Sequence, residues 1–596
     1  MSREKDFGKR LIWIQWIVAM SFLTLVFRLW QLQIIKGSEY LAQSIRNRTR
    51  LQKIQAPRGF VFDARGRPLV KNIPSFNVCL LPQYIKGQIS AQERLAKNLT
   101  LNPSFLKERV VDIEGSFHST ALKIKEGISR EELGLIAQDR MILPGVMIDV
   151  VPKRVYVEGY LGAHLLGYVG EVGRKDIGRG YPPFNYQPGD YLGKCGVEQA
   201  ADGLLRGVDG GIQAEVDASG QRIRVLTERG AIPGKNVFLT INLDLQRLGE
   251  ECLGARTGAL VALDPRDGRI LTMVSHPPFN PNLFSQKIAK RDWESLLADP
   301  SCPMINRAIQ GQLPPGSIYK VICAIAGLEE GVVDPDTTFY CPGYLRLGNR
   351  TFGCWKKGGH GKVNLKRAII SSCDVYFYRL GLRLGVDRLG KYARLFGLGE
   401  KTAIALGGER AGFIPTYRWK KERFGGGWSV GEVASLAIGQ GYNLVTPLQV
   451  ANLYSAIANG GVLYLPQYML GVAGEGERVS LQFSPRMLKK IFISPNTLGV
   501  IRDALWGVVN SPEGTGWRGR VFGLEVAGKT GTAQVVERGK KGGDRRFSDH
   551  AWFVAFAPKD EPRIAVVAVI EHGGHGGGAA APVVQKFLLG WKNCMG

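Results

Sequence analysis

A serine and a lysine three positions apart are the residues of this chain whose types and spacing could support covalent catalysis. Ser317 and Lys320 follow two prolines and Gly316, and they precede an apolar stretch, residues 321–328, with the pattern of a buried helix. Because the prolines and the glycine stop the preceding chain, Ser317 is predicted to lie in the first helical turn. Residues i and i+3 share a helix face, so Lys320 Nζ could reach the Ser317 hydroxyl. A desolvated lysine loses pKa and can act as the base for a serine nucleophile, while backbone N–H groups of this turn lie near the developing oxyanion.

Two further motifs carry side chains that suit the same chemistry. The first is Ser371-Ser372-Cys373-Asp374, and the second is the run Lys529, Thr530, Gly531 and Thr532 inside a strand-like segment, residues 524–536. Glycines in a strand permit close approach of another backbone, so a peptide could lie along this edge with its carboxylate at Lys529 and the threonine hydroxyls. Taken singly, each motif has a structural alternative, because Ser-x-x-Lys pairs arise by chance, a serine can cap a helix and a lysine can lie in a surface turn.

Four residues have the types that bind a zinc ion. Cys341, Cys354, His360 and Cys373 are separated by 13, 6 and 13 residues, and three thiolates with one imidazole suit tetrahedral Zn²⁺. We expect the acyl-transfer chemistry to require no cofactor, so this zinc would be structural. The alternatives are a Cys341–Cys354 disulfide or buried free thiols. Because Cys373 sits inside the second motif, a bound metal would fix the catalytic loop directly.

The N-terminus predicts a membrane anchor. Residues 11–27 contain only three polar side chains, and residues 1–10 carry four basic residues against two acidic ones. Such a helix reaches roughly 26 Å, at the short end of spanning length. No small-x-small cleavage site follows, so an uncleaved signal anchor at residues 11–33 is favoured over a cleaved signal or a buried helix. The positive flank would keep residues 1–10 in the cytoplasm and place the rest of the chain across the membrane.

Composition limits the partners of the outward-facing part. The 596 residues carry a formal net charge of +26, which favours anionic partners such as nucleic acid, lipid headgroups or an acidic polymer. An extracytoplasmic location argues against nucleic acid. With 44% hydrophobic and 22% charged residues the chain has the composition of a folded protein, and nine unevenly spaced cysteines do not form a disulfide scaffold.

The elements that must position these motifs fall into two regions. Residues 34–250 predict a mixed α+β module of short elements without catalytic residue types, including a hairpin at residues 60–70. Residues 255–590 predict one α/β catalytic domain that opens with a β-hairpin, residues 258–274, turning at 265–268. Thr446-Pro447 predicts a helix start, and Asn459 lies near its end. The chain is therefore predicted to be multidomain, with an anchor, a spacer and a catalytic domain.

Together and in this order, the three motifs resemble those of the penicillin-recognising serine acyltransferases. Within that superfamily the chain is most similar to penicillin-binding protein 2, the class B, elongation-type branch. The resemblance covers nearly the whole chain, including the short tail and anchor. Its further motifs are Arg58-Gly59, Asp63-x-Arg65-Gly66, residues 189–198, Ile438-Gly-Gln-Gly441, His550-Ala-Trp-Phe and Ala579-Ala-Ala-Pro582. The family implies a pedestal domain and a transpeptidase domain like serine β-lactamases, with an antiparallel sheet flanked by helices.

The resemblance also implies a role for each matched residue. Ser317 would attack the penultimate D-Ala carbonyl of a peptidoglycan stem peptide, with Lys320 as general base. Ser372 and Asp374 would shuttle protons and hold Lys320 and the substrate; most class B relatives have asparagine at the second position. The substrate carboxylate would meet Lys529, Thr530, Gly531 and Thr532, and the N–H groups of Ser317 and Thr532 would form the oxyanion hole. Some relatives hold a metal near the middle motif, which His360 and Cys373 match while Cys341 and Cys354 replace acidic ligands.

By this resemblance the chain is expected to be a D,D-transpeptidase of cell-wall elongation that β-lactams inhibit covalently. It is expected to lie in the inner membrane, with its catalytic domain in the periplasm. No glycosyltransferase-sized domain precedes the catalytic one, so the glycan built from lipid-linked precursor would come from a SEDS-type polymerase contacting the anchor and spacer. Two other functions use the same acyl-serine. One is hydrolysis, as a carboxypeptidase or β-lactamase, and the other is a sensor or scaffold that responds to β-lactams.

Overall fold

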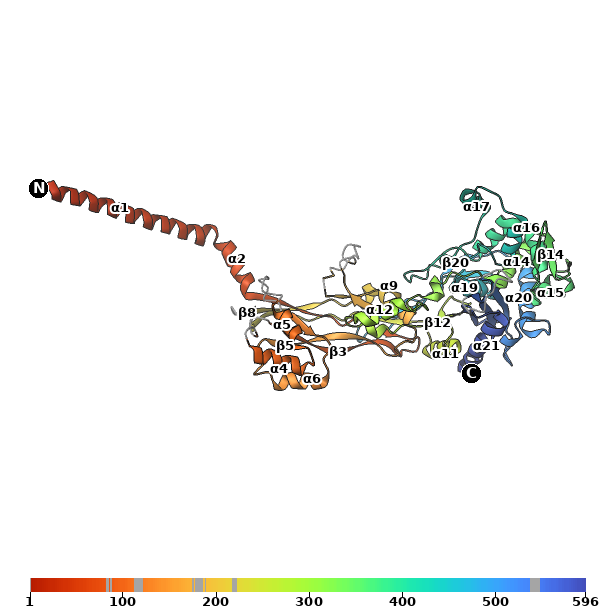
Figure 1. The fold of residues 1–596 in the computed structure, drawn as a ribbon, viewed down its shortest axis with the longest axis horizontal. Helices are drawn as coiled ribbons and strands as arrows, with labels where there is room; N and C mark the ends of the chain where they lie inside the picture. Colours follow the sequence, from red (N-terminus) through yellow and green to blue (C-terminus); the bar gives the residue numbers. More distant parts are fainter. Residues whose placement is uncertain are drawn as a thin grey trace. The chain divides into compact units, whose positions relative to one another are not determined.

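The computed structural model describes residues 2–81, 85, 88–111, 122–173, 176, 186–187, 189–216, 222–535 and 547–595. The chain divides into two compact units, and Figure 1 labels their elements in chain order. The first unit comprises Met1–Pro57, Pro74–Pro152 and Gly207–Pro233, and the second Arg58–Ile73, Lys153–Arg206 and Gly234–Gly596. Residues 34–250 are thus shared between the units, whereas 255–590 lie in the second. The domain boundaries drawn from the sequence stay predictions.

The chain begins with a long apolar helix. Helix α1 (Ser2–Trp30) continues into a π-helical turn, η1 (Gln31–Ile35). Within them Leu11–Ile35 form a stretch of 25 residues with mean hydropathy 1.7 and no buried residue. This length and composition are sufficient to cross a bilayer. The helix therefore fits the single anchor predicted at residues 11–33.

The first unit combines an antiparallel sheet with short helices around its own core. The sheet has the order β1-β8-β9, in which Thr49 pairs with Glu215 and Ile54 with Gly210. Helix α6 begins with a capping box between Ser129 and Glu132. The elements are α2 (Gly37–Arg48), β1 (Thr49–Ile54), α4 (Ile89–Asn98), α5 (Pro103–Val111), β4 (Leu122–Lys125), α6 (Arg130–Gln138), β8 (Gly210–Val216) and β9 (Arg222–Arg229). Two strands, β3 (Pro68–Leu80) and β5 (Val146–Tyr156), contribute residues to both units.

The second unit is built on an antiparallel sheet with the order β12-β11-β23-β22-β21. Its strands are β11 (Gly258–Leu263), β12 (Ile270–His276), β21 (Ala527–Ala533), β22 (His550–Ala557) and β23 (Ile564–Ile570). Alternate residues of β11 enter two different cores, because Ala259 and Val261 point to one face and Leu260 and Ala262 to the other. Both faces are therefore covered, which explains why the central strands β11 and β23 are apolar throughout. The predicted hairpin of residues 258–274 is confirmed as β11 and β12.

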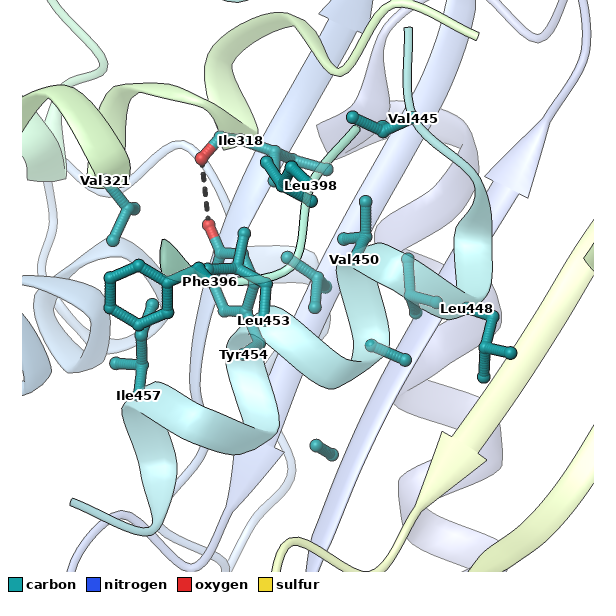
Figure 2. Close-up of a cluster of buried hydrophobic side chains, with 14 of the residues drawn as sticks. Ile318, Val321, Phe396, Leu398, Val445, Leu448, Val450, Leu453, Tyr454 and Ile457 are labelled. Carbon is teal, nitrogen blue, oxygen red and sulfur yellow. Dashed lines mark hydrogen bonds between the residues drawn. The ribbon is translucent and has the colours of Figure 1, made fainter. Parts of the chain in front are cut away.

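Helices cover both faces of this sheet. Helices α11 (Leu243–Leu253) and α21 (Gly576–Met595) pack on one face, and α19 (Pro447–Ala458) packs on the other. Thr446 caps α19 with Pro447 in its first turn, as the sequence predicts. Figure 2 shows α19 among buried apolar side chains, where the Tyr454 hydroxyl donates to the Ile318 carbonyl oxygen at 3.2 Å. The buried helix thus holds the turn that contains Ser317.

The remaining elements of the second unit are short except for two helices of 22 and 16 residues, α16 and α20. They are β2 (Val61–Phe62), α7 (Ala163–Leu166), β6 (Val169–Glu171), β7 (Tyr191–Gly193), α9 (Gly196–Ala200), α10 (Asp202–Leu205), β10 (Asn236–Leu239), η2 (Pro281–Phe284), α12 (Lys290–Ala298), α13 (Arg307–Gln310), η3 (Gly316–Ile318), α14 (Lys320–Glu329), β13 (Phe339–Cys341), β14 (Tyr344–Leu347), β15 (Arg350–Gly353), β16 (Gly361–Val363), α15 (Leu365–Ile370), α16 (Asp374–Leu395), α17 (Tyr417–Phe424), α18 (Val430–Ala437), β17 (Val462–Tyr464), β18 (Met469–Ala473), β19 (Ser480–Leu481), β20 (Met487–Lys490), α20 (Pro495–Asn510) and η4 (Trp517–Gly519). The hairpin predicted at residues 60–70 is confirmed, since Val61 of β2 pairs with Val70 of β3.

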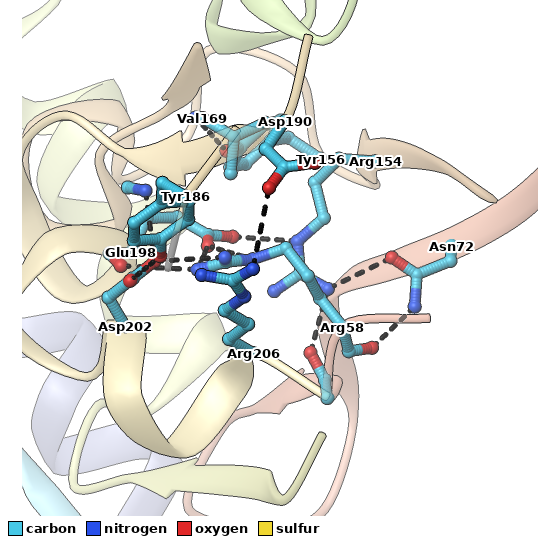
Figure 3. A network of polar contacts seen from close by, with 12 residues as sticks. Arg58, Asn72, Arg154, Tyr156, Val169, Tyr186, Asp190, Glu198, Asp202 and Arg206 are labelled. Carbon is cyan, nitrogen blue, oxygen red and sulfur yellow. Dashed lines mark hydrogen bonds and ion pairs between the residues drawn. The ribbon is translucent and has the colours of Figure 1, made fainter. Parts of the chain in front are cut away.

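A buried ion network joins the early segments of the second unit (Figure 3). Glu198 is fully buried and accepts from Arg58 Nη2 at 2.9 Å and from Arg154 Nε at 2.7 Å. Arg58 also donates to Asp202 at 2.9 Å. A buried charge is tolerated only when paired, so these contacts fix residues 58–73 against residues 153–206.

Candidate active site

Ser317 lies in a 3₁₀ turn, η3, that leads into α14, close to the position the sequence predicts. Gly316 before it has φ +54°, a left-handed conformation that glycine adopts without steric cost. A Cβ at Gly316 would lie 2.4 Å from the carbonyl oxygen and 3.1 Å from the nitrogen of Thr532. The missing side chain therefore lets the serine turn approach the backbone of strand β21. This approach brings the main chain at Ser317 beside that of Thr532.

Lys320 is completely buried at the start of α14 and is held by the middle motif. Its Nζ donates to the Ser372 carbonyl oxygen at 2.8 Å, to Ser372 Oγ at 3.3 Å and to Asp374 Oδ1 at 2.7 Å. These acceptors match the three donors of an ammonium group. Contact between Lys320 and the Ser317 hydroxyl stays a prediction for the reacting complex, because the structure points the lysine at the middle motif.

The middle motif occupies the link between α15 and α16. Ser372 has φ +52°, which is unusual for a residue with a side chain and belongs to the cap of α15, where the Ser372 N–H donates to the Ile369 carbonyl oxygen and the Cys373 N–H to that of Ala368. Its hydroxyl lies between two lysines, since it accepts from Lys529 Nζ at 2.8 Å as well as from Lys320. Asp374 is the first residue of α16, and its Oδ2 accepts from the Trp355 backbone N–H at 2.8 Å. The carboxylate is thus bound at both oxygens.

Lys529 and its neighbours form edge strand β21. Lys529 is completely buried, and burial followed by the charge of Lys320 lowers its pKa well below the usual range, while Asp374 opposes the shift. Thr530 Oγ1 contacts Thr515 Oγ1 at 2.8 Å. The Thr532 carbonyl oxygen accepts from Gln440 Nε2 at 3.0 Å. The edge therefore presents a cation and hydroxyls beside the serine turn, which suits an anionic peptide end.

The structure brings together every residue predicted for catalysis and substrate binding, from η3, α14, the α15–α16 link and β21. Three contacts were not foreseen from the sequence. Trp355 and Thr515 carry no motif that would single them out, and their partners are distant in sequence. Gln440 does lie in the Ile438-Gly-Gln-Gly441 motif, so its position could have been suspected although its contact could not.

The four predicted metal ligands also converge. Their ligand atoms lie within 4.8 Å of one another, and they come from the end of β13, the residue after β15, the residue before β16 and the N-cap of α16. All nine cysteines, including Cys341 and Cys354, are free thiols in the structure. His360 Nδ1 lies 3.6 Å from Cys341 Sγ and 3.5 Å from Cys354 Sγ. Tetrahedral zinc with its usual bond lengths separates sulfur and nitrogen ligands by about 3.6 Å, so the donors fit that ion.

Two thiols of this cluster lie close enough to affect each other's ionisation. The contact with Cys373 lowers the pKa of Cys354, and the same contact raises the pKa of Cys373, so the pair favours one thiolate. The cluster is buried, with Cys373 fully inaccessible and His360 9% exposed. A metal held here would tie the hairpin segment at Cys354 to the loop that carries Ser372.

Comparison with known proteins identifies the family. The model of the penicillin-binding protein transpeptidase domain matches residues 258–589, and that of the penicillin-binding protein dimerisation domain matches residues 53–239. The peptidoglycan D,D-transpeptidase MrdA of Acinetobacter baumannii is 35% identical over 98% of this chain and 88% of its own length. MrdA of Haemophilus influenzae is 34% identical over 94% of this chain and 88% of its own length.

Solved structures agree with the sequence matches. A complex between penicillin-binding protein 2 and MreC from Helicobacter pylori superposes with a TM-score of 0.79 at 28% identity, covering 92% of this chain and 99% of that one. A peptidoglycan synthase complex that coordinates polymerization and crosslinking gives a TM-score of 0.72 at 30% identity, covering 98% and 99%. By these matches over nearly its full length, the chain belongs to the penicillin-binding protein transpeptidases, on the branch of penicillin-binding protein 2.

Proposed function

We propose that this chain is a peptidoglycan D,D-transpeptidase that cross-links stem peptides through an acyl-serine at Ser317 during cell-wall elongation. The observation that carries the proposal is the convergence of three motifs on one point. The Ser372 hydroxyl joins Lys320 and Lys529. The close backbone approach at Gly316 brings Ser317 beside Thr532 of the strand that carries Lys529. The names of the curated relatives agree with this activity.

The reaction follows from the groups at hand. Ser317 Oγ attacks the penultimate D-Ala carbonyl carbon, and Lys320 takes the hydroxyl proton after passing its own to Asp374, 2.7 Å away. The N–H groups of Ser317 and Thr532 stabilise the oxyanion. The C–N bond then breaks, and the leaving D-alanine amine takes a proton from the Lys320–Ser372 pair. An amine of a second stem peptide attacks the acyl-Ser317, which forms the cross-link and restores the serine.

Substrate orientation is assigned to strand β21. Lys529 attracts the terminal carboxylate of the donor peptide, with Thr530 and Thr532 as hydroxyl partners and Gly531 letting the serine turn approach the strand. A Cβ at Gly531 would lie 2.9 Å from the Pro315 carbonyl oxygen and 3.0 Å from Ile318 Cγ1, so glycine is required where the strand meets the serine turn. A charged group on a dry edge gives stronger carboxylate recognition than it would in water.

A labelled penicillin tests the acyl-serine directly. The purified full chain is incubated with the label, and adducts are compared with those of Ser317→Ala. The matched control is Ser435→Ala, a helical serine whose hydroxyl donates to the Gly431 carbonyl oxygen at 3.0 Å. We expect a stable adduct in the unaltered and control proteins and none in Ser317→Ala.

Other outcomes favour the other functions. Rapid turnover of the penicillin would indicate a β-lactamase, because the acyl-enzyme would then be open to water. Absence of any adduct would indicate a catalytically idle scaffold. A carboxypeptidase would hydrolyse stem peptides instead, and would release D-alanine from a donor peptide without forming a cross-link.

For the metal, we propose that Cys341, Cys354, His360 and Cys373 hold a structural Zn²⁺. The ion would supply charge neutralisation for the thiolates and would fix the loop carrying Ser372, with no part in acyl transfer. Support comes from the converging donors and their sulfur–nitrogen separations. Purified protein should contain about one zinc per chain, lost in Cys354→Ala and kept in the control Cys252→Ala, a buried cysteine outside the cluster. Metal-free protein with full penicillin reactivity would refute the assignment.

For location and partners, we propose that the chain is a single-pass protein of the inner membrane with its catalytic unit in the periplasm. The apolar helix Leu11–Ile35 supports a single anchor. A SEDS-type glycan polymerase is the proposed partner at the anchor helix and the spacer of residues 34–250. Structures of relatives with MreC and in a peptidoglycan synthase complex support protein partners. Alkaline phosphatase fused to the C-terminus should be active in cells; an inactive fusion would contradict this orientation. Co-purification with the polymerase should be lost when the anchor is exchanged.

A further inference from the structure

Trp355 binds two points of the catalytic middle loop although no motif contains it. Its backbone N–H donates to Asp374 Oδ2 at 2.8 Å, and its indole Nε1–H donates to the Ser371 carbonyl oxygen at 2.9 Å. The ring stands edge-on to His360 at 5.5 Å between centroids. Even so, the side chain is 48% exposed, so hydrophobic burial does not by itself account for its placement.

Ser372, one of the two residues between these points, has an unusual backbone. Its φ of +52° costs free energy for a residue with a side chain and is supported by the cap of α15, in which the Ser372 N–H donates to the Ile369 carbonyl oxygen and the Cys373 N–H to that of Ala368. The Ser371 carbonyl on one side is held by the Trp355 indole, and the Ser372 carbonyl on the other side by Lys320 Nζ at 2.8 Å. Without the indole contact, the two capping bonds alone would resist rotation of the Ser371–Ser372 peptide.

Such a rotation would displace a shared acceptor. Ser372 Oγ lies 2.8 Å from Lys529 Nζ and 3.3 Å from Lys320 Nζ, so both buried cations depend on its position. Proton transfer is sensitive to hydrogen-bond geometry, whereas strand β21 is held by its pairing with β22 and meets this loop through Lys529 Nζ, so carboxylate binding is less affected than proton transfer. A defect in the loop should therefore slow acylation more than it weakens initial binding.

We propose that Trp355 is a positioning residue of the acyl-transfer reaction, whose indole N–H holds the Ser371 carbonyl and so helps the cap of α15 to keep the Ser372 hydroxyl between the two lysines. The inference rests on the proposed function, because it assigns a role within that reaction. It concerns the side chain alone, since the backbone donor to Asp374 survives in any variant other than proline.

The test compares Trp355→Phe with Trp517→Phe in the full chain. Phenylalanine keeps an aromatic ring beside His360 and removes the N–H donor. Trp517 is the matched control, because it is also exposed, at 62%, and belongs to the same unit. Stopped-flow acylation by a labelled penicillin gives the dissociation constant of the initial complex and the first-order acylation rate separately. Melting temperature and bound zinc are measured on the same samples.

For Trp355→Phe we expect an acylation rate about 3- to 10-fold lower, because the loss of one hydrogen bond raises the barrier by that factor. The dissociation constant of the initial complex should stay within about 2-fold of that of the unaltered protein. Zinc and melting temperature should match those of Trp517→Phe. An unchanged acylation rate would overturn the inference, and so would a loss accompanied by equal loss of zinc or of folded protein. Failure of the proposed function itself would look different, because the unaltered chain would then form no Ser317 adduct.

Discussion

A methyl group at Gly316 should disable the site while leaving the fold in place. A Cβ there would lie 2.4 Å from the Thr532 carbonyl oxygen and 2.8 Å from its carbonyl carbon, whereas real Cβ contacts essentially never fall below 3.0 Å. The serine turn and strand β21 must therefore separate by about 0.6 Å in Gly316→Ala. Misplacement of reacting groups by about 1 Å costs on the order of 100-fold in rate. We expect acylation by penicillin to fall by about 10- to 100-fold.

The control for this variant is Gly331→Ala. Gly331 also has a left-handed conformation, with φ +63°, and nothing lies within 4 Å of its added Cβ. Both variants therefore bear a similar backbone cost of roughly 1–2 kcal/mol, and in a unit of this size a melting temperature lower by about 1–2 °C is expected from that cost alone. Only Gly316→Ala also widens the gap between Ser317 and Thr532.

The assay is the second-order rate constant of acylation by a labelled penicillin, measured on folded protein at 25 °C. If Gly316→Ala reacts as fast as Gly331→Ala, the close approach of the serine turn to strand β21 does not set the rate, and the assignment of the oxyanion hole to these two segments is refuted. A loss confined to Gly316→Ala at comparable melting temperatures supports it.

Three further outcomes follow from the contacts of single side chains. Ser372→Ala removes the acceptor shared by two buried lysines, so acylation should fall by about 100-fold or more in the penicillin assay. Burial depresses the pKa of Lys529, so between that pKa and about 10.5 the unfolded chain binds more protons than the folded one. The free energy of unfolding should therefore rise with pH across this range. Thermal melting should show a smaller rise in Lys529→Met. Glu198→Gln leaves two buried arginines without their shared carboxylate and should lower the free energy of unfolding by about 3–5 kcal/mol in urea titrations.

Each of these has a matched comparison. Ser435→Ala should acylate normally, and equal rates for Ser372→Ala would contradict the proton-shuttle role. A pH–stability curve for Lys529→Met that parallels the unaltered protein would show that Lys529 is not the group whose titration matters. Glu294→Gln removes an exposed partner of Lys290 and should change stability by less than about 1 kcal/mol. An equally small effect of Glu198→Gln would show that the buried network contributes little.

Local sequence patterns were sufficient for the elements that carry the motifs. The apolar hairpin β11–β12 and the capped helix starting at Pro447 were predicted from turn chemistry and the helix-cap signal, and the structure confirms both. Ser317 was placed in a first turn for the same reason, because two prolines and Gly316 stop the chain before it. These features depend on neighbours within a few residues, which a sequence displays directly.

Contacts between distant segments could not be predicted in the same way. The pairing of β2 with β10, Val61 opposite Val237, recruits residues 58–73 to the second unit, and no local pattern specifies that partner. The left-handed backbone of Ser372 belongs to the cap that ends α15, but no glycine marks that position in the sequence. The further contacts of this loop, with Lys320 and Trp355, come from elsewhere in the chain. The four candidate metal ligands were recognisable by type, but only the fold shows that they meet.

Cross-linking of defined stem peptides tests the central claim most directly. The full chain is incubated with a D-Ala-D-Ala-terminated donor and an amine-bearing acceptor peptide, and the products are counted by mass spectrometry. We predict one D-alanine released for each cross-link formed, with both products absent in Ser317→Ala. Release of D-alanine without cross-links, or cross-links that persist in Ser317→Ala, would contradict the assignment of acyl transfer to this serine.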